Sequence, residues 1–382
     1  MEPTLEMNST LVETCLAVGL ELSKGSWKLA LHDGKREKPA LYTAADDGAQ
    51  ARLEHTLALV ESVRNKWRLD NSTTVVFVYE AGQDGFWIAR ELEKHGVRCL
   101  MVDAASIPVE RRARRAKTDR LDAIRLVNSL RGWLRGERDR MHVIRIPSVE
   151  AEGYRHLTRD RGTLQKEIGQ HRDRLRKLLC TVGCWEAIDR EFPQRLEQGQ
   201  IRTHDGSPLQ AELQERLKRE CVRLALVQEE LAELERGLVH QLPASEQQKI
   251  AQLSRLNGIG EIGAFRLVLE LFWRDFANQR QVGACVGLVP QPYDSGNSRV
   301  DQGISKQGNR RVRSLLIEMA WMWLRYQPQS ALACWFAQRS SGGNKRQRRI
   351  AIVAVARRLA IALWRYLVDG VIPDGAGLKA KR

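Results

Sequence analysis

The sequence predicts an α/β domain followed by two mainly helical domains, because three patterns succeed one another along its 382 residues. Over residues 12–147, short β-branched runs alternate with segments of helical spacing. Over residues 148–245, long polar helices carry leucines at intervals of seven. Over residues 246–372, glycine turns separate apolar helices. We therefore expect the class α/β plus all-α, with domain boundaries near these residues.

The first domain is expected to be a sheet covered by helices. Residues 15–33 indicate two strands around the turn SKGS, and TTVVFVYE, which ends at Glu80, is typical of a buried central strand. Helical spacing marks residues 49–67 and 85–95, and the segment VRCLMVD indicates a further strand. A last helix follows the basic stretch that leads to Asp119. The predicted order is β, β, α, β, α, β, α.

The second domain is expected to be a helical arm. Leucines recur at positions 217, 224, 231 and 238, while Glu220 is the exception on the apolar face. About three heptads indicate a coiled coil or helical hairpin, whose partner is the helix at 151–181. The dense Arg and Lys face of that helix is either solvated or in contact with DNA or RNA. Such an arm is also a natural device for dimerisation.

The third domain begins with LNGIGEIGAFRLVLEL. Gly258, Gly260 and Gly263 occupy a tight turn before an apolar helix, and such a turn presents backbone N–H groups to a phosphate, as helix-hairpin-helix elements do. A glycine turn between two helices is also ordinary architecture. We treat Gly258 and Gly260 as candidate nucleic-acid contacts.

The net charge of +15 is concentrated in two stretches. Residues 105–180 contain 20 Lys and Arg against 10 Asp and Glu, and residues 295–382 contain 17 against 4. Clustered basic charge is typical of a polyanion partner, most often nucleic acid. A hydrophobic content of 43% and a charged content of 29% exclude a disordered chain. We expect a protein that lies in the cytoplasm on its nucleic acid.

Neither a zinc site nor a membrane segment is expected. The seven cysteines are scattered, and no second Cys or His pair accompanies Cys180 and Cys184. The apolar stretch IAIVAVARRLAIALW carries Arg357 and Arg358 in its middle, which argues against a membrane span. The N-terminus lacks the basic and apolar regions of a signal peptide.

Four carboxylates of the first domain form a candidate metal site. Glu21 ends the first strand, Glu80 ends the third, and Asp119 and Asp122 in AKTDRLDA share one face of a helix start. Taken singly, each glutamate is more typical of a strand stop, and the two Asp residues are more typical of a helix N-terminus or of arginine–aspartate pairs on a solvated face. Gathered at one sheet edge, they repel one another unless cations are bound, and such a set suits two Mg²⁺ ions in phosphoryl transfer.

Two basic groups accompany these acids. The run before Asp119 is a candidate phosphate guide, and the segment around Ser295 leads into a basic helix start. A serine held beside Arg and Lys is a candidate nucleophile towards phosphorus, although a serine in a Gly-rich loop is common for conformational reasons. The candidate nucleic-acid contacts are Arg111, Arg112, Arg114, Arg115, Lys117, Lys306, Arg310, Arg311 and Arg313.

Five segments in order resemble the transposases of the insertion-sequence 110 family, the DEDD transposases also described as bridge-RNA-guided recombinases. They are GLELSK, YEAGQDGFW, AKTDRLDA, LNGIGEIGA and GLVPQPYDSGNSRVDQGISKQGNRRVRSLL, within residues 15–370. The resemblance implies a RuvC-like, RNase H-type domain, a coiled-coil arm and a C-terminal transposase domain with an essential serine. By position, the metal ligands are Glu21, Glu80, Asp119 and Asp122, and the serine is Ser295.

The resemblance further implies strand exchange between donor and target DNA through a covalent serine–DNA phosphodiester, assisted by Mg²⁺. It also implies a composite site completed within a dimer or tetramer formed through the arm, and in some members a guide RNA. The family usually has Asp where this chain has Glu21, whose extra methylene changes metal geometry; Asp33 is a less suitable substitute. Two alternatives stay open: a RuvC-like, Mg²⁺-dependent, structure-selective endonuclease in which Ser295 is a loop residue, and a catalytically silent nucleic-acid-binding protein.

Overall fold

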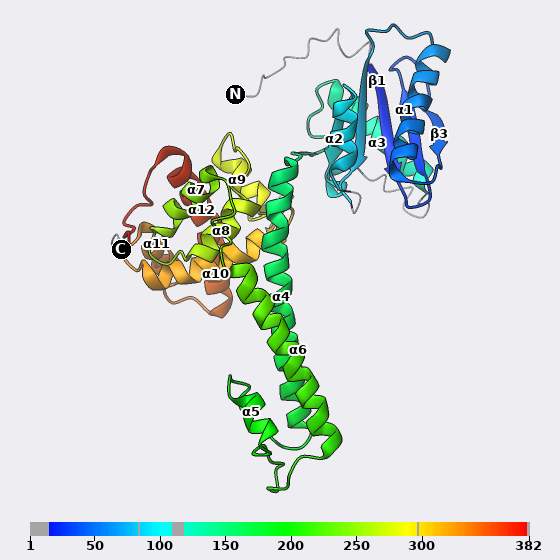
Figure 1. Ribbon diagram of the computed structural model, residues 1–382. Helices are drawn as coiled ribbons and strands as arrows, with labels where there is room; N and C mark the ends of the chain where they lie inside the picture. Colours follow the sequence, from blue (N-terminus) through cyan, green and yellow to red (C-terminus); the bar gives the residue numbers. More distant parts are fainter. Residues whose placement is uncertain (1–14, 83–84, 109–117, 296–297, 380–382) are drawn as a thin grey trace. The chain divides into compact units, whose positions relative to one another are not determined.

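The computed structural model describes residues 15–82, 85–108, 118–295 and 298–379 (Figure 1). It divides into two compact units, Met1–Ser148 and Val149–Arg382. The first unit is mixed α/β and the second is mainly helical, so the predicted change of class along the chain is confirmed. The predicted separation of residues 148–245 from 246–372 stays a prediction.

The first unit contains a six-stranded mixed sheet in the order β3-β2-β1-β4-β5-β6. β1 pairs antiparallel with β2 and parallel with β4, and β4 pairs parallel with β5. Both central strands are largely buried, in agreement with their apolar sequences. The arrangement is compatible with the expected RuvC-like fold. The strands are β1 Cys15–Leu22, β2 Trp27–His32, β3 Ala40–Ala44, β4 Thr74–Glu80, β5 Arg98–Val102 and β6 Val143–Ile144.

Helices cover the sheet on both faces, and alternate residues of each strand belong to different cores. Leu20 and Tyr79 pack in the cluster that includes α1 (Ala49–Lys66) and α2 (Trp87–Lys94). Ala17 and Val78 pack in the cluster that includes α3 (Asp119–Leu134). The sequence prediction missed β3 and β6, because both are short edge strands in which few residues are fully buried.

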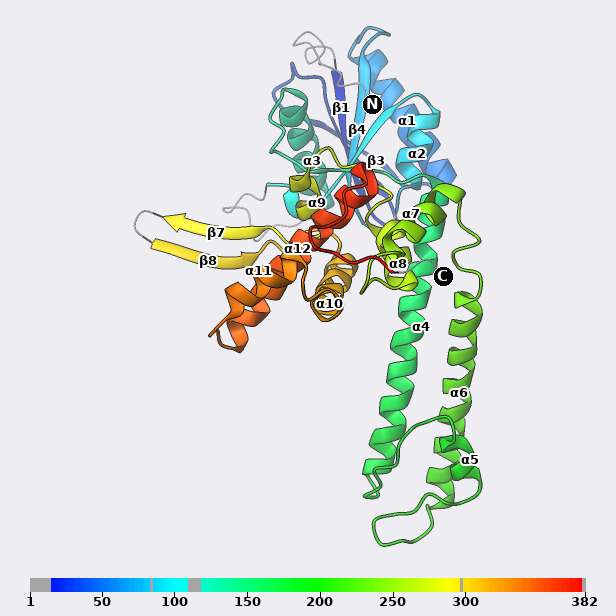
Figure 2. The same ribbon diagram turned by 90° about the vertical axis from the view of Figure 1, so that its left-hand side faces the viewer.

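The second unit begins with two long helices that lie side by side, α4 (Val149–Cys180) and α6 (Ala211–Glu235) (Figure 2). They run antiparallel, because His171 of α4 contacts Glu220 of α6 while Arg161 contacts Glu235. The connection between them carries the short helix α5 (Phe192–Glu197) and packs its own small core. The predicted helix 151–181 is therefore confirmed, whereas Leu238 lies beyond the end of α6 and joins the C-terminal core.

Glu220 interrupts the leucine pattern because it forms a buried polar cluster between the two helices. Its carboxylate lies 2.6 Å from His171 Nδ1 and accepts hydrogen bonds from Arg174 and Arg223. Burial by itself raises the pKa of Glu220, but the His171 hydrogen bond and Arg174 bring that pKa below its usual value. A polar cluster of this kind fixes the register of a helix pair.

Among the described residues after 243, six helices form the C-terminal body around one large core, which includes Trp323, Phe265 and Leu359. A hairpin of β7 (Pro290–Ser295) and β8 (Ser298–Ile304) extends from these helices (Figure 2). The sequence prediction treated this segment as a loop, and the hairpin corrects it. The helices are α7 Ala244–Ser254, α8 Glu261–Glu270, α9 Gln279–Cys285, α10 Arg310–Tyr326, α11 Ala331–Ser340 and α12 Lys345–Asp369.

In the part of the chain that the structure describes, no helix combines the length and apolar character needed to cross a membrane. Within α12, the Arg358 guanidinium lies 4.0 Å from the centre of the Trp335 ring. This contact provides a place for one of the two arginines that interrupt the apolar stretch.

Candidate active site and nucleic-acid surface

Glu21 and Glu80 lie next to each other at the ends of two neighbouring parallel strands. They immediately follow the paired residues Leu20 and Tyr79. Successive side chains of a strand alternate between the faces of the sheet, so both glutamates share the face of Val78, which packs on α3. The carboxyl ends of β1 and β4 thus carry two half-buried carboxylates on the α3 face.

The first turn of α3 lies towards the same edge. Its Ala123 packs over Gly19 near the carboxyl end of β1, whereas Arg131, two turns later, contacts His32 at the other end of the sheet. Asp119 and Asp122 therefore start the helix near the strand ends that carry the two glutamates. Carboxylates in a first helical turn also interact favourably with the helix dipole.

Gly19 allows α3 to pack close to β1. A Cβ atom at this position would lie 2.6 Å from both the Ala123 carbonyl oxygen and the Val127 amide nitrogen. Both are backbone atoms, so they cannot move without shifting the helix. The close packing fixes the depth of α3 on the sheet and, with it, the position of Asp122 relative to β1.

We predict that Gly19→Ala destabilises the first unit by about 2 to 3 kcal/mol, because the added methyl overpacks a helix–strand contact. Gly25→Ala is the matched control, since a Cβ there has no neighbour within 4 Å. It should change the free energy of unfolding by less than about 0.5 kcal/mol. Urea denaturation followed by circular dichroism measures both values. Equal stability of the two variants would contradict the close packing of α3.

The donor chemistry at this edge fits Mg²⁺, which prefers carboxylate oxygens. Among the described residues, however, no three His, Cys, Asp or Glu side chains lie close enough together to hold a metal ion. Asp122 instead accepts a hydrogen bond of 2.7 Å from Arg125, and only 12% of its side chain is exposed. The structure therefore brings the backbones of the acidic positions to one edge without closing their carboxylates around a metal.

Of two other charged residues in the first unit, one lies beside this edge and the other lies at the opposite end of the sheet. Lys28 is the cross-strand neighbour of Glu21, and its ammonium group donates to Thr43. Asp33 follows the opposite end of β2, and its carboxylate accepts the N–H groups of Lys35 and Arg36. Asp33 is therefore at the far end of the sheet from Glu21 and does not replace it.

Ser295 is the last residue of β7 and pairs in register with Ser298 of β8. The base of this hairpin is held by close backbone packing. A Cβ on Gly287 would lie 1.8 Å from the Gln307 carbonyl oxygen, and the residue has φ +65°. Lys306 also adopts a positive φ, of 56°, and donates its N–H to Gly287. Only glycine fits this contact, which fixes the start of the hairpin.

The basic helix start beside the hairpin is anchored by Asn309. Its side-chain oxygen caps α10 by accepting the N–H groups of Arg311 and Val312, while its amide donates to Glu270. The predicted contacts Lys306, Arg310 and Arg311 are exposed around this cap. Burial and the neighbouring Arg310 lower the pKa of Arg313, whose guanidinium donates to the Val286 carbonyl. Arg313 is thus partly committed to holding the hairpin base.

The glycine turn between α7 and α8 packs against two other parts of the unit. Gly258 has φ +82°, and a Cβ there would lie 3.3 Å from the Met322 carbonyl oxygen of α10. The C-terminal segment bonds the turn on another side, where Lys379 donates to the carbonyls of Arg255 and Ile259. Gly260 precedes α8, and no side chain caps this helix start. The predicted glycine turn before an apolar helix is present, while its helix-hairpin-helix-like role and its contact with phosphate stay predictions.

The five basic residues at 111–117, which are candidate nucleic-acid contacts, lie outside the described residues.

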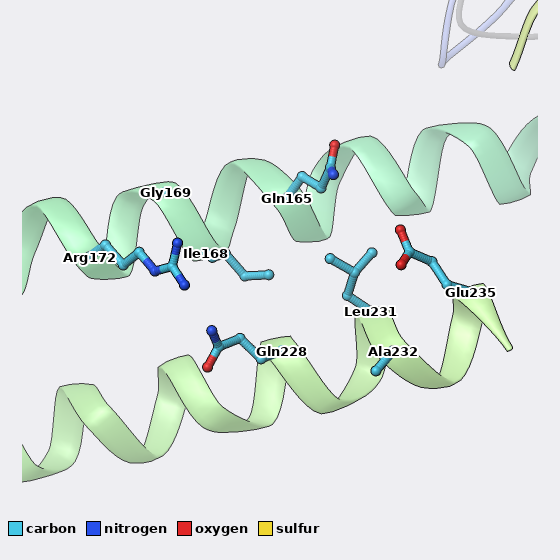
Figure 3. A pocket seen from close by; sticks show the side chains of 8 residues that line it. All are labelled: Gln165, Ile168, Gly169, Arg172, Gln228, Leu231, Ala232 and Glu235. Atoms are coloured by element: carbon cyan, nitrogen blue, oxygen red, sulfur yellow. The ribbon is translucent and has the colours of Figure 1, made fainter. Parts of the chain in front are cut away.

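A hollow between α4 and α6 is lined by Ile168 and Arg172 from one helix and by Gln228 and Leu231 from the other (Figure 3). The residues that line it include no nucleophile–base pair, so the hollow offers no catalytic arrangement.

Comparisons with known proteins assign the chain to a family. A family model described as Transposase IS116/IS110/IS902 family matches residues 250–335, and a DEDD model of the IS110 type, described as Transposase, matches residues 34–183. The relative y4rJ of Sinorhizobium fredii (strain NBRC 101917 / NGR234), named as a transposase, is 39% identical over 95% of this chain and 94% of its own length. The chain belongs to the IS110 family of transposases.

Shorter matches extend the same assignment. The transposase for insertion sequence element IS1328 of Yersinia enterocolitica is 30% identical over 38% of this transposase and 42% of its own length. That for IS1533 of Leptospira borgpetersenii is 29% identical over 34% and 36%. The predicted family is confirmed, and the chain is an insertion-sequence transposase, a DNA-processing enzyme. Glu80, Asp119, Asp122 and Ser295 fall within the two matched segments, whereas Glu21 precedes the first.

Proposed function

We propose that the transposase cleaves and rejoins DNA through a covalent bond between Ser295 and a DNA phosphate, with Mg²⁺ held by Glu21, Glu80, Asp119 and Asp122. The observation that carries the metal site is the shared sheet edge and face of β1, β4 and α3. Carboxylates from three elements at one edge are electrostatically costly without a cation. The match of residues 250–335 to a transposase family model supports the assignment of Ser295.

The proposed reaction conserves the number of phosphodiester bonds. The Ser295 hydroxyl attacks phosphorus and loses its proton, a serine–phosphate ester forms, and the bond to the leaving DNA oxygen breaks with protonation of that oxygen. A hydroxyl of a second DNA end then attacks the ester and restores the serine. Bound Mg²⁺ would neutralise charge on the attacking and leaving oxygens.

Basic residues would hold the polyanions around this chemistry. We assign phosphate contacts to Lys306, Arg310 and Arg311, which are exposed beside the hairpin base, to Arg313, and to the glycine turn at Gly258 and Gly260. The run at residues 111–117, immediately before Asp119, would guide backbone phosphates towards the acids. These contacts are independent of sequence, so target choice would come from a guide RNA paired with DNA.

Pairing of two or more chains through α4 and α6 would join the serine of one chain to the acids of another. This assembly would place donor and target DNA in one complex. The buried Glu220 cluster, which fixes the register of the helix pair, supports a defined arm on which such pairing depends.

A recombination assay tests the proposed function. The purified transposase is mixed with plasmids that carry donor and target sites, with the element's flanking RNA supplied or withheld. We expect joined product with Mg²⁺, none after chelation with EDTA, and recovery when Mg²⁺ is added back, while DNA binding persists throughout. Undiminished strand exchange in EDTA would contradict the metal site. Cutting without joining would favour the endonuclease alternative, and binding without either would favour a silent nucleic-acid-binding protein.

A further inference from the structure

Two arginines lie against one tryptophan, with a third arginine beside them, at a place in the second unit where α4 meets the end of α8. Arg155 lies with its guanidinium carbon 5.6 Å from the centre of the Trp273 ring, and that of Arg274 lies 4.8 Å away. Arg159 follows Arg155 by one helical turn, which places the two on the same face of α4. The sequence does not predict this group, because Arg155 and Arg159 lie more than a hundred residues from Trp273 and Arg274.

Four N–H donors of this group are buried without acceptors. The Nε atoms of Arg155, Arg159 and Arg274 and the Nε1 atom of Trp273 are all shielded from solvent, and none has a hydrogen-bond partner. Arg274 directs one Nη atom at the Cys285 sulfur, 3.4 Å away, which is a weak acceptor. Four unpaired donors in one place are costly unless an acceptor occupies the site.

The charges of the group are also unbalanced. Glu270 is buried nearby, but its oxygens already accept hydrogen bonds from Thr158 and Asn309, and Arg155 Nε remains 3.9 Å away. Burial lowers the pKa of Arg155; Glu270 and Glu152 oppose this shift, whereas the neighbouring charges of Arg159 and Arg274 add to it. The two carboxylates do not neutralise three guanidinium groups, and the oxygens of Glu270 are already engaged by Thr158 and Asn309. An anion with several oxygens would neutralise the excess charge and accept the unpaired N–H groups together.

We propose that Arg155, Arg159 and Arg274, with Trp273 beside them, form a binding site for one backbone phosphate of DNA or RNA. The inference rests on the proposed function, because the anion comes from the nucleic acid on which the transposase acts. Guanidinium forks match phosphate oxygens in geometry, and the Trp273 ring holds two of them in place. Glu270 connects this site to Asn309 and hence to the helix start beside the Ser295 hairpin.

The test measures how the affinity for nucleic acid depends on salt. Fluorescence anisotropy gives Kd for the full chain on a labelled DNA duplex, and separately on a single-stranded RNA, over a series of NaCl concentrations. The variants are Arg155→Gln and Arg274→Gln. Arg216→Gln is the control, since it removes the same charge from an exposed position on α6. Arg274→Lys keeps the charge but loses the fork.

We expect each Gln variant to weaken binding to one of the two nucleic acids by about tenfold at low salt. The slope of log Kd against log[NaCl] should fall by about 0.9 for the DNA duplex, or by about 0.7 for the single-stranded RNA, as for one lost phosphate contact. The nucleic acid that shows the change is the source of the phosphate. Arg216→Gln should keep the slope of the wild type, and Arg274→Lys should keep the slope while losing part of the affinity. Unchanged slopes in both Gln variants, with normal binding by the wild type, would overturn this inference alone, whereas no binding by the wild type would overturn the proposed function as well.

A second measurement needs no substitution. Cys285 contacts Arg274, so an occupied site should slow its reaction with N-ethylmaleimide, while exposed Cys180 serves as the internal reference. Peptide mass spectrometry follows both cysteines with and without the nucleic acid. Slower labelling of Cys285 in the presence of nucleic acid, with Cys180 unchanged, supports the site even if a variant fails to fold. A Cys285 labelling rate that is the same with and without nucleic acid would contradict the site.

Discussion

Ser295→Ala is expected to abolish strand exchange while DNA binding stays within about twofold of the wild type. The substitution removes only the hydroxyl oxygen that is proposed to bond to phosphorus, and no other nucleophile replaces it. Because Ser295 is the last residue of β7, alanine at this position is compatible with the strand. A plasmid recombination assay measures the loss, and an anisotropy titration measures the retained affinity.

The matched control for this variant is Ser298→Ala, which removes a hydroxyl from the residue paired with Ser295 across the hairpin. It should recombine DNA at a rate close to that of the wild type. If Ser295→Ala continues to exchange strands, or if both serine variants lose activity equally, the assignment of the nucleophile is wrong.

The second large effect is expected for Asp122→Asn, which should slow recombination by about a thousandfold. A metal ion contributes several kcal/mol to a phosphoryl-transfer transition state, and about 4 kcal/mol corresponds to that factor. Asparagine keeps the size of the side chain but removes the charge that a metal ligand needs. Affinity for DNA should be unchanged or slightly higher, because a negative charge is lost near the polyanion. Single-turnover kinetics at saturating protein separate the two effects.

Asp33→Asn provides the control for a lost carboxylate in the same unit. Asp33 lies at the opposite end of the sheet, and an asparagine oxygen can still accept the N–H groups of Lys35 and Arg36. Its activity should stay within about twofold of the wild type. A strong loss of activity in Asp33→Asn, combined with normal activity in Asp122→Asn, would contradict the proposed metal site and favour one at the opposite end of the sheet.

The sequence predicts the first unit well because its signals are local. The β-branched run TTVVFVYE identifies β4 without tertiary information, and the alternation of apolar residues after Cys15 identifies β1. The strand ends then predict where Glu21 and Glu80 lie. What the sequence does not predict is the closeness of the carboxylates, since the ion pair between Asp122 and Arg125 depends on side-chain conformation.

The sequence around Ser295 contains a signal for the hairpin. Two residues, Gly and Asn, separate Ser295 from Ser298, and a two-residue connection of this kind is a hairpin signal. The prolines before it are typical of a loop, so the composition of this segment predicts a loop where the structure has a hairpin. The pattern of Gly287 and Lys306, by contrast, has no sequence signature, because the two meet only through folding.

The arm and the arginine group mark the limit of prediction from sequence. Glu220 breaks the leucine repeat, but only the structure shows that His171 and Arg174 pair with it. Arg155 and Arg274 come from different elements and meet around Trp273. Long-range charge clusters of this type follow from how helices pack, and periodicity contains no information about them.

The most direct test of the central claim is to locate the covalent bond on the wild-type transposase. The reaction is run with Mg²⁺ on a suicide DNA substrate, whose nicked strand diffuses away and traps the intermediate. After denaturation, nuclease and protease digestion, mass spectrometry identifies the peptide that carries a nucleotide phosphate. We predict a phosphoserine ester at Ser295 and at no other residue. Cut DNA without any protein adduct, or an adduct on a different residue, would contradict the account.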